Sequence, residues 1–176
     1  MAILDIITAP HPILEAKARE VRAEEFCGGL GIHLSDMAET MYAAPGVGLA
    51  APQVADSRRI VVIDPGEKDE RGRRLFKMCN PVITQRSKDK IPWMETCLSV
   101  PGIEIEVMRN RVVTVEWQAA EDGCAQHGVF EDYEAVIVQH ELDHLIGTVL
   151  LDRVSSFKRR RYLKAIQKRQ KDQVIV

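Results

Sequence analysis

The chain has 176 residues, of which 45% are hydrophobic and 28% charged, and its formal net charge is −2. These values are ordinary for a globular protein and predict one domain, residues 1–176, with a substantial core. No apolar run approaches the roughly 20 residues that a membrane-spanning helix needs. The N-terminus does not read as a secretion signal, and the four scattered cysteines favour reduced thiols. We therefore expect a cytoplasmic protein without a membrane partner.

The first third of the chain alternates short elements with turn signals. Residues 1–22 predict an extended lead-in with a short helical piece, and residues 23–44 predict a helix. Glycines at 28–31 indicate a break in the first half of that helix, because each costs about 1 kcal/mol against alanine in a helix interior. Residues 46–53 form a loop of small residues, which another backbone or a ligand can approach closely.

The middle of the chain is rich in strand patterns. Strands are expected at residues 59–64, 76–84, 93–99, 103–107, 111–118 and 124–130. Asn80-Pro81 indicates a bulge, Pro101-Gly102 a turn, and Asp122-Gly123 a hairpin. Helices are then expected at 132–145 and 155–170. This order favours an α+β fold, with antiparallel β-sheets packed around a central helix and further helices at the N- and C-terminal ends.

The last predicted helix is strongly basic. Nine basic residues and no acidic ones lie between Arg153 and Lys171, which leaves 15 basic against 26 acidic residues elsewhere, a balance of −11. Charge alone fits a solvated helix face as well as a surface that binds a polyanion.

The central helix carries the pentapeptide His140-Glu141-Leu142-Asp143-His144. Residues four apart lie on one face of a helix, so both imidazoles can bind one metal ion while Glu141 reaches a water on it. A surface helix with two chance histidines is the alternative for this pentapeptide alone. Gly147 stands where such a helix would end.

A catalytic site of this type needs a third protein ligand. The extended metalloprotease pattern would place a histidine at position 150, which is Leu150, and residues 145–176 contain no glutamate. The third ligand must therefore lie upstream, where Cys97 has a modest lead because it ends a predicted strand. The other upstream candidates are His11, His33, His127, Cys27, Cys79 and Cys124, and packing is the simpler reading of those three cysteines.

Three motifs taken together resemble those of the peptide deformylases, in the same order. They are Gly46-Val47-Gly48-Leu49-Ala50-Ala51-Pro52-Gln53, Glu95-Thr96-Cys97-Leu98-Ser99 and Gln139-His140-Glu141-Leu142-Asp143-His144. The resemblance covers nearly the whole chain. It implies a hydrolase that removes the formyl group from N-formylmethionyl peptides and releases formate.

The resemblance also implies roles for individual residues. Cys97, His140 and His144 would hold one divalent metal ion, Fe²⁺ in the cell, with Zn²⁺, Ni²⁺ or Co²⁺ as substitutes. Glu141 would move the protons, while the backbone N–H of Leu98 and the side chain of Gln53 would stabilise the oxyanion. Substrate contacts would come from Val47, Gly48, Glu95 and Thr96, and a methionine pocket from Tyr133, Val136 and Ile137, for which ordinary core packing is an equal reading. The basic C-terminal helix resembles the segment with which such enzymes approach the ribosome.

Thr96 departs from the family pattern, which has glycine before the cysteine. If the position required a positive φ, threonine would cost about 1–3 kcal/mol of strain. Two other functions therefore stay open: a deformylase-like protein with altered or lost activity that binds peptide N-termini, and an endopeptidase with the His-Glu-x-x-His motif. The missing downstream ligand disfavours the endopeptidase.

Overall fold

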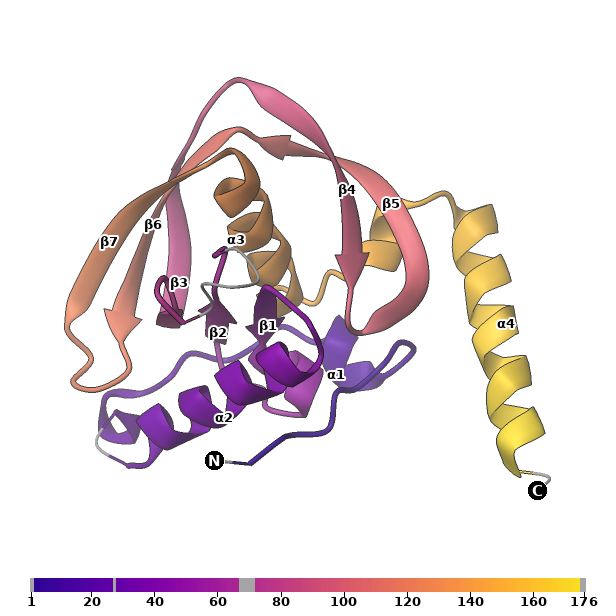
Figure 1. The fold of residues 1–176 in the computed structure, drawn as a ribbon, viewed down its shortest axis with the longest axis horizontal. Coiled ribbons are helices and arrows are strands. Elements are labelled where there is room, and N and C mark those ends of the chain that lie inside the picture. The colour runs from indigo at the N-terminus through magenta and orange to yellow at the C-terminus, as the bar shows by residue number, and fades with distance from the viewer. Residues whose placement is uncertain (1, 27, 67–71, 175–176) are drawn as a thin grey trace.

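The computed structural model describes residues 2–26, 28–66 and 72–174, and contains two antiparallel sheets and four α-helices in these ranges (Figure 1). The helices are α1 (Pro12–Glu15), α2 (Leu30–Ala43), α3 (Asp132–Leu145) and α4 (Ser156–Val174), with single-turn 3-10 helices η1 (Ala23–Glu25), η2 (Ala51–Val54) and η4 (Leu150–Arg153). The strands are β1 (Gly48–Ala50), β2 (Ile60–Ile63), β3 (Phe76–Arg86), β4 (Lys90–Cys97), β5 (Val100–Asn110), β6 (Val112–Ala119) and β7 (Ala125–Glu131). The expected α+β class is confirmed.

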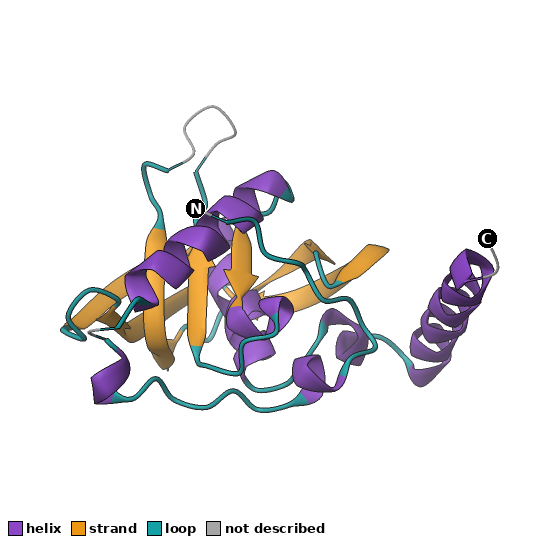
Figure 2. Cartoon of the chain, turned by 90° about the horizontal axis from the view of Figure 1, so that it is seen from below, coloured by secondary structure: helices purple, strands orange, loops and turns teal. Residues whose placement is uncertain are grey.

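The larger sheet has the strand order β1-β2-β3-β6-β7, and β4 with β5 forms a separate hairpin. Strand β2 is buried along its whole length because both faces of the sheet are covered. Val61 and Ile63 pack toward α3, while Ile60 and Val62 pack with α2. Figure 2 shows α2 lying across one face of the sheet. Helix α3 is thus enclosed between the sheet and the hairpin, as expected for the motif helix.

The glycine cluster breaks the first helix where expected. Gly29 precedes α2 with φ +71°, and the residues before it form only the single turn η1. Asn80 has φ +52°, and the register of β3 against β6 shifts after Cys79, so the bulge is confirmed. Helix α3 has the predicted bounds.

Two local predictions were wrong. The chain turns at Leu98-Ser99 and not at Val100–Gly102, because Cys97 pairs with Val100 and closes the hairpin earlier. Pro101 is tolerated inside β5 because, among the described strands, β5 pairs with β4 alone and is an edge strand. Strand β4 also begins at Lys90, three residues before the expected start at residue 93.

Helix α4 stands beside the hairpin at the edge of the molecule (Figures 1 and 2). Its first turns are attached by Tyr162 and Leu163, which pack on a third core cluster beneath the hairpin. In the described residues no helix has the length and apolar character needed to cross a membrane.

Candidate active site

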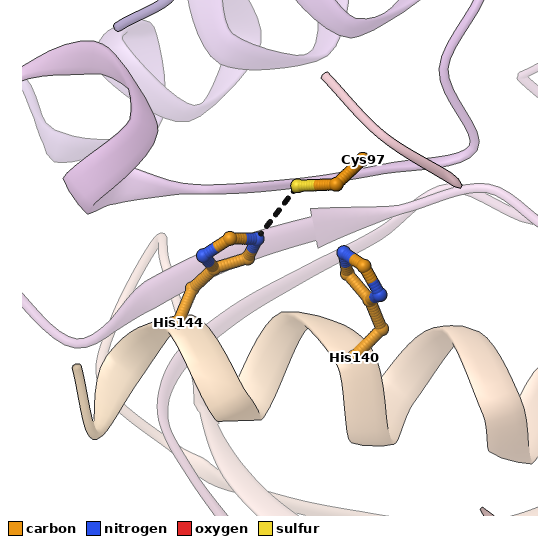
Figure 3. A group of neighbouring side chains, drawn as sticks. All are labelled: Cys97, His140 and His144. Carbon is orange, nitrogen blue, oxygen red and sulfur yellow. Dashed lines mark hydrogen bonds between the residues drawn. The ribbon is translucent and has the colours of Figure 1, made fainter. Parts of the chain in front are cut away.

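Helix α3 and strand β4 bring three metal-binding side chains together (Figure 3). The ring centroids of His140 and His144 are 5.2 Å apart, and Cys97 Sγ lies 3.3 Å from His144 Nε2. One ligand atom from each of the three lies within 4.8 Å of the other two. A thiolate with two imidazoles is a donor set that zinc and other borderline divalent metals accept.

The end of α3 is set by its neighbours as well as by its own sequence. Gly147 follows the helix with φ +75°, and a Cβ there would lie 2.5 Å from the carbonyl oxygen of Glu15. Glycine is therefore needed both for the backbone conformation and for the close approach of the N-terminal segment. This contact fixes the C-terminal end of α3 and with it the position of His144, which lies one helical turn after His140 and is more deeply buried.

A buried ionic network orients His140. Its Nδ1 lies 2.8 Å from Glu95 Oε2, and Arg109 donates to both Glu95 oxygens at 2.6 and 2.9 Å. Arg109 also donates to Asp143 on α3, at 2.7 Å. Because Nδ1 donates to Glu95, the Nε2 lone pair of His140 is turned toward Cys97. Burial opposes the charge of Glu95, but the hydrogen bonds from Arg109 and His140 lower its pKa to about 2.

This arrangement differs from the expected role of Glu95. Glu95 is 4% exposed, and both of its carboxylate oxygens bind Arg109 or His140, so a direct side-chain contact with substrate does not fit. Arg109 was missed by the sequence analysis, although a signal was present. Ile103, Ile105 and Val107 alternate inward along β5, and Arg109 occupies the next inward position.

The side chain of Glu141 is buried where α3 packs against β1. Burial raises the pKa of its carboxyl group to about 7, and its Oε2 has no hydrogen-bond partner in the described part of the chain. On the side of β1, a Cβ on Gly48 would overlap the Glu141 carboxylate and lie 2.7 Å from its Cδ. The glycine of the first motif therefore leaves the space that this carboxylate occupies.

Gln53 is held with its amide nitrogen directed at the site. Its Oε1 accepts from the backbone N–H of Ala50 at 2.8 Å, and its Nε2 donates to Ser99 Oγ at 3.2 Å. The same Nε2 lies 3.8 Å from Cys97 Sγ. Since the side chain is 2% exposed, these contacts restrict it to one orientation.

These groups face a cavity of about 370 Å³. Every residue predicted for the site lines it except His144, which lies behind it and is 1% exposed: Val47, Gly48, Gln53, Glu95, Thr96, Cys97, Leu98, Tyr133, Val136, Ile137, His140 and Glu141. Tyr133 is at the rim, where its ring stacks on Trp93 with centroids 5.3 Å apart. Pro45, Gly46, Met94 and Pro101 also line the cavity and were not among the predicted site residues, although Gly46 begins the first motif and the other three lie within two residues of a motif.

The other proposed metal ligands lie elsewhere. His11 caps α1, His33 pairs with Asp56, and His127 is exposed on β7. Cys79 is buried in the core, where burial raises the pKa of its thiol to about 12. The expected packing role of Cys124 is wrong, because this residue is exposed in the hairpin turn. Cys27 lies outside the described residues.

Comparison with known proteins identifies the family. The family model described as polypeptide deformylase matches residues 3–160. The peptide deformylase of Desulfotalea psychrophila is 40% identical over 169 residues, which are 96% of this chain and 97% of that protein. That of Zymomonas mobilis is 40% identical over 174 residues, 97% of each chain.

Solved structures agree with these sequence matches. The peptide deformylase of Ehrlichia chaffeensis superposes with a TM-score of 0.88 at 31% identity, covering 98% of this chain and 99% of that one. The Thermus thermophilus enzyme gives 0.80 at 38% identity, covering 94% of each. The chain belongs to the peptide deformylase family.

Proposed function

We propose that Cys97, His140 and His144 hold the single metal ion with which this protein removes N-formyl groups. Peptide deformylases are metal-dependent amidohydrolases that release formate from N-formylmethionyl peptides, and this chain is one of them. The observation that carries the residue assignment is the convergence of three ligand atoms within 4.8 Å, beside a cavity that Glu141 also lines.

The donor set fits the proposed ion. Cys97 binds as a thiolate, and the two imidazoles bind through nitrogens that face it. When bound, the ion supplies Lewis-acid polarisation of the formyl carbonyl and acidifies water at the site. We propose Fe²⁺ as the ion in the cell, and Zn²⁺, Ni²⁺ and Co²⁺ as alternatives, because one thiolate with two imidazoles suits all four.

Glu141 is the proposed general base and acid. Its carboxylate is buried against Gly48, and one oxygen has no partner among the described residues, which leaves it available to accept a proton from water. It then passes the proton to the departing amine of the methionine. Gln53 Nε2 and the backbone N–H of Leu98 are the proposed donors to the oxyanion.

The formylated peptide is proposed to lie extended between β1 and β4. Val47 and Gly48 offer backbone groups on one side, and the unpaired edge of β4 at Thr96 lies on the other. Val136 and Ile137, with Tyr133 at the rim, form the apolar wall for the methionine side chain. Glu95 acts indirectly: its side chain orients His140 and does not contact the peptide.

Thr96 does not carry the strain that would weaken this function. Positive φ among non-glycine residues of the described chain is confined to Pro45, Ala55, Asn80 and Asp132. Threonine in β4 has extended backbone that suits a β-branched residue. Loss of activity through strain at this position, the main support for a binding-only protein, is therefore not supported, and the endopeptidase still lacks a downstream ligand.

We also propose that residues 1–176 act as one deformylase domain in the cytoplasm. The basic, exposed start of α4 supports a weak contact with the ribosome through RNA phosphates.

Formate release from formyl-Met-Ala-Ser by the metal-loaded protein tests the proposal. Wild type should turn over. Glu141→Gln should keep its metal but lose about 10²–10⁴-fold in rate, the range of general acid–base catalysis. Cys97→Ala should lose metal. Full metal occupancy in Cys97→Ala would overturn the ligand assignment, and cleavage of an internal peptide bond without formate release would favour the endopeptidase.

A further inference from the structure

The active-site cavity adjoins a second groove beside the β4–β5 hairpin. This groove, of about 730 Å³, runs between β5 and the first turns of α4. Its floor is apolar, from Met94 and Ile103, and its walls are charged. In Figure 1, α4 lies alongside β5. Residues of α4 line the side of the groove opposite β5.

The two cavities share a boundary. Met94 lines both of them, and the consecutive residues Pro101 and Gly102 line the first and the second. Met94 is 54% exposed, so a large apolar side chain is left open to solvent between the two cavities. An occupant of the active site that passes over the Met94 side chain can therefore reach the groove.

The direction of the peptide leads toward this boundary. Strand β4 pairs only with β5 in its sheet, so an extended peptide can follow the other edge. Cys97 and Met94 are three residues apart, and an extended peptide advances about 3.3 Å per residue, as the strand does. A peptide that runs antiparallel to β4, with its first residue level with Cys97, thus brings its fourth residue level with Met94.

The groove is a formed surface, because α4 is attached to the hairpin and to the N-terminal segment. Tyr162 Oη donates to the carbonyl oxygen of Pro101 at 3.3 Å, and Arg159 donates to Glu15 at 3.1 Å. The helix wall is therefore placed before any peptide arrives, which lowers the cost of ordering on binding.

The walls carry opposite charges that do not pair with each other. Glu104 and Glu106 project from β5, and Lys158 and Arg161 from α4. Among the ion pairs of the described residues, none involves these four side chains. Arg161 does lie over the ring of Phe157, 5.9 Å from its centroid. A charged side chain on a bound peptide can still pair with the opposite wall without first breaking an ion pair between described residues.

We propose that this groove binds the fourth to sixth residues of the formylated substrate, with an acidic side chain of that stretch pairing with Lys158 and Arg161. This inference rests on the proposed function, because it needs the peptide's first residues in the active site. It gives the enzyme a preference among nascent chains beyond the residues beside methionine.

The test compares formate release from formyl-Met-Ala-Ser with release from two six-residue peptides that add Ala-Glu-Ala or Ala-Lys-Ala. In wild type, kcat/KM for the Glu peptide should exceed that for the Lys peptide by about two- to fivefold, the size expected of exposed ion pairs. Lys158→Glu/Arg161→Glu should reverse this order. Arg160→Glu/Lys164→Glu, which makes the same charge change on α4 outside the groove, should not.

The outcomes separate the two proposals. Turnover of the three-residue peptide by every variant shows that the variants fold and that the active site works. Equal kcat/KM for both long peptides in wild type, or reversal by Arg160→Glu/Lys164→Glu as well, would overturn the groove proposal. No formate from any peptide would instead count against the proposed function.

Discussion

Two ionic clusters in this protein are built from the same kinds of side chain and differ in what they face. The metal-side cluster consists of Glu95, Arg109, His140 and Asp143, and the α2-side cluster of Glu25, His33, Asp56 and Arg58. Each joins a carboxylate to an arginine and a histidine.

The α2-side cluster holds secondary structure together. Asp56 lies 2.6 Å from Arg58 Nη2 and 3.0 Å from His33 Nε2, which links the start of β2 to α2. None of its members lines the active-site cavity. In the metal-side cluster, the second nitrogen of His140 is directed at Cys97 beside that cavity. The two clusters have the same kinds of side chain. What differs is the second ring nitrogen of the histidine, which in His140 is directed at the candidate metal site.

Among changes that leave every catalytic and ionic side chain in place, the largest expected effect comes from Gly48→Ala beside the metal-side cluster. Gly48→Ala would force the Glu141 carboxylate away from β1, because the added Cβ overlaps it. A displacement of about 1 Å at a catalytic group can cost about 10²-fold in rate. We expect that loss in kcat for formyl-Met-Ala-Ser, with metal content unchanged.

Gly31→Ala is the matched control for this substitution. Gly31 lies inside α2, and no atom of the described residues stands within 4 Å of an added Cβ. We expect full activity and a gain of about 0.4–1 kcal/mol in stability. A wild-type rate in Gly48→Ala would contradict the confinement of Glu141 by β1.

The next largest effect is a loss of metal affinity, which we expect from a substitution in the metal-side cluster and not from the same substitution in the α2-side cluster. Glu95→Gln removes the charge that orients His140, and loss of such an outer partner lowers metal affinity by about 10–100-fold. Competition with a chelator measures this constant. Unchanged affinity would mean that Glu95 serves only to neutralise Arg109.

Asp56→Asn makes the same carboxylate-to-amide change in the α2-side cluster. Metal affinity and kcat should stay at wild-type values, while the free energy of unfolding falls by about 1–3 kcal/mol, the value of hydrogen bonds to a charged group. Burial opposes the charge of Asp56, but hydrogen bonds with His33 and Arg58 hold its pKa below the usual range.

The sign of the pH dependence follows from that lowered pKa. A carboxyl group whose pKa is lower in the folded state stabilises the protein above its unfolded value of about 3.9, and loses this contribution as the pH falls toward the folded value. The stability difference between wild type and Asp56→Asn should therefore be constant near neutral pH and shrink below about pH 4. Denaturant unfolding at several pH values measures it, and a difference that grows on acidification would contradict the role of Asp56.

Local signals explain which parts of this fold could be predicted. The spacing of His140 and His144 and the apolar residues before them define α3, and Gly29 and Asn80 mark a helix start and a bulge through their own backbone preferences. Strand β1 was missed because its three residues, Gly48–Ala50, are all buried and show no alternation. The turn at Leu98-Ser99 was missed because strand register outweighed the local Pro-Gly signal.

The residues of the candidate site also differ in whether a local or a long-range signal could predict them. The histidine pair is local and was predicted from spacing, whereas the choice of Cys97 among the upstream ligands depended on family resemblance, because its distance from α3 is set by the whole hairpin. The contact of Arg109 with Glu95 crosses between two strands and joins residues that are 14 positions apart. No short-range pattern specifies such a pairing, although the inward register of β5 places an arginine where an apolar residue is expected.

The smallest expected effect is at Thr96, the departure from the family pattern. Thr96 is exposed in β4 and falls at a register shift between the pairs Glu95–Ile105 and Cys97–Val100. Because its φ is not positive, Thr96→Gly relieves no backbone strain and instead adds freedom to the unfolded chain, costing about 0.5–1 kcal/mol of stability. We expect kcat/KM for formyl-Met-Ala-Ser to stay within about threefold of wild type, since neither ionic cluster nor the Glu141 site is touched. A kcat/KM tenfold or more above wild type in Thr96→Gly would show that the threonine obstructs the peptide at the edge of β4. Activity would then be limited by peptide binding at β4 and not by the metal-side cluster.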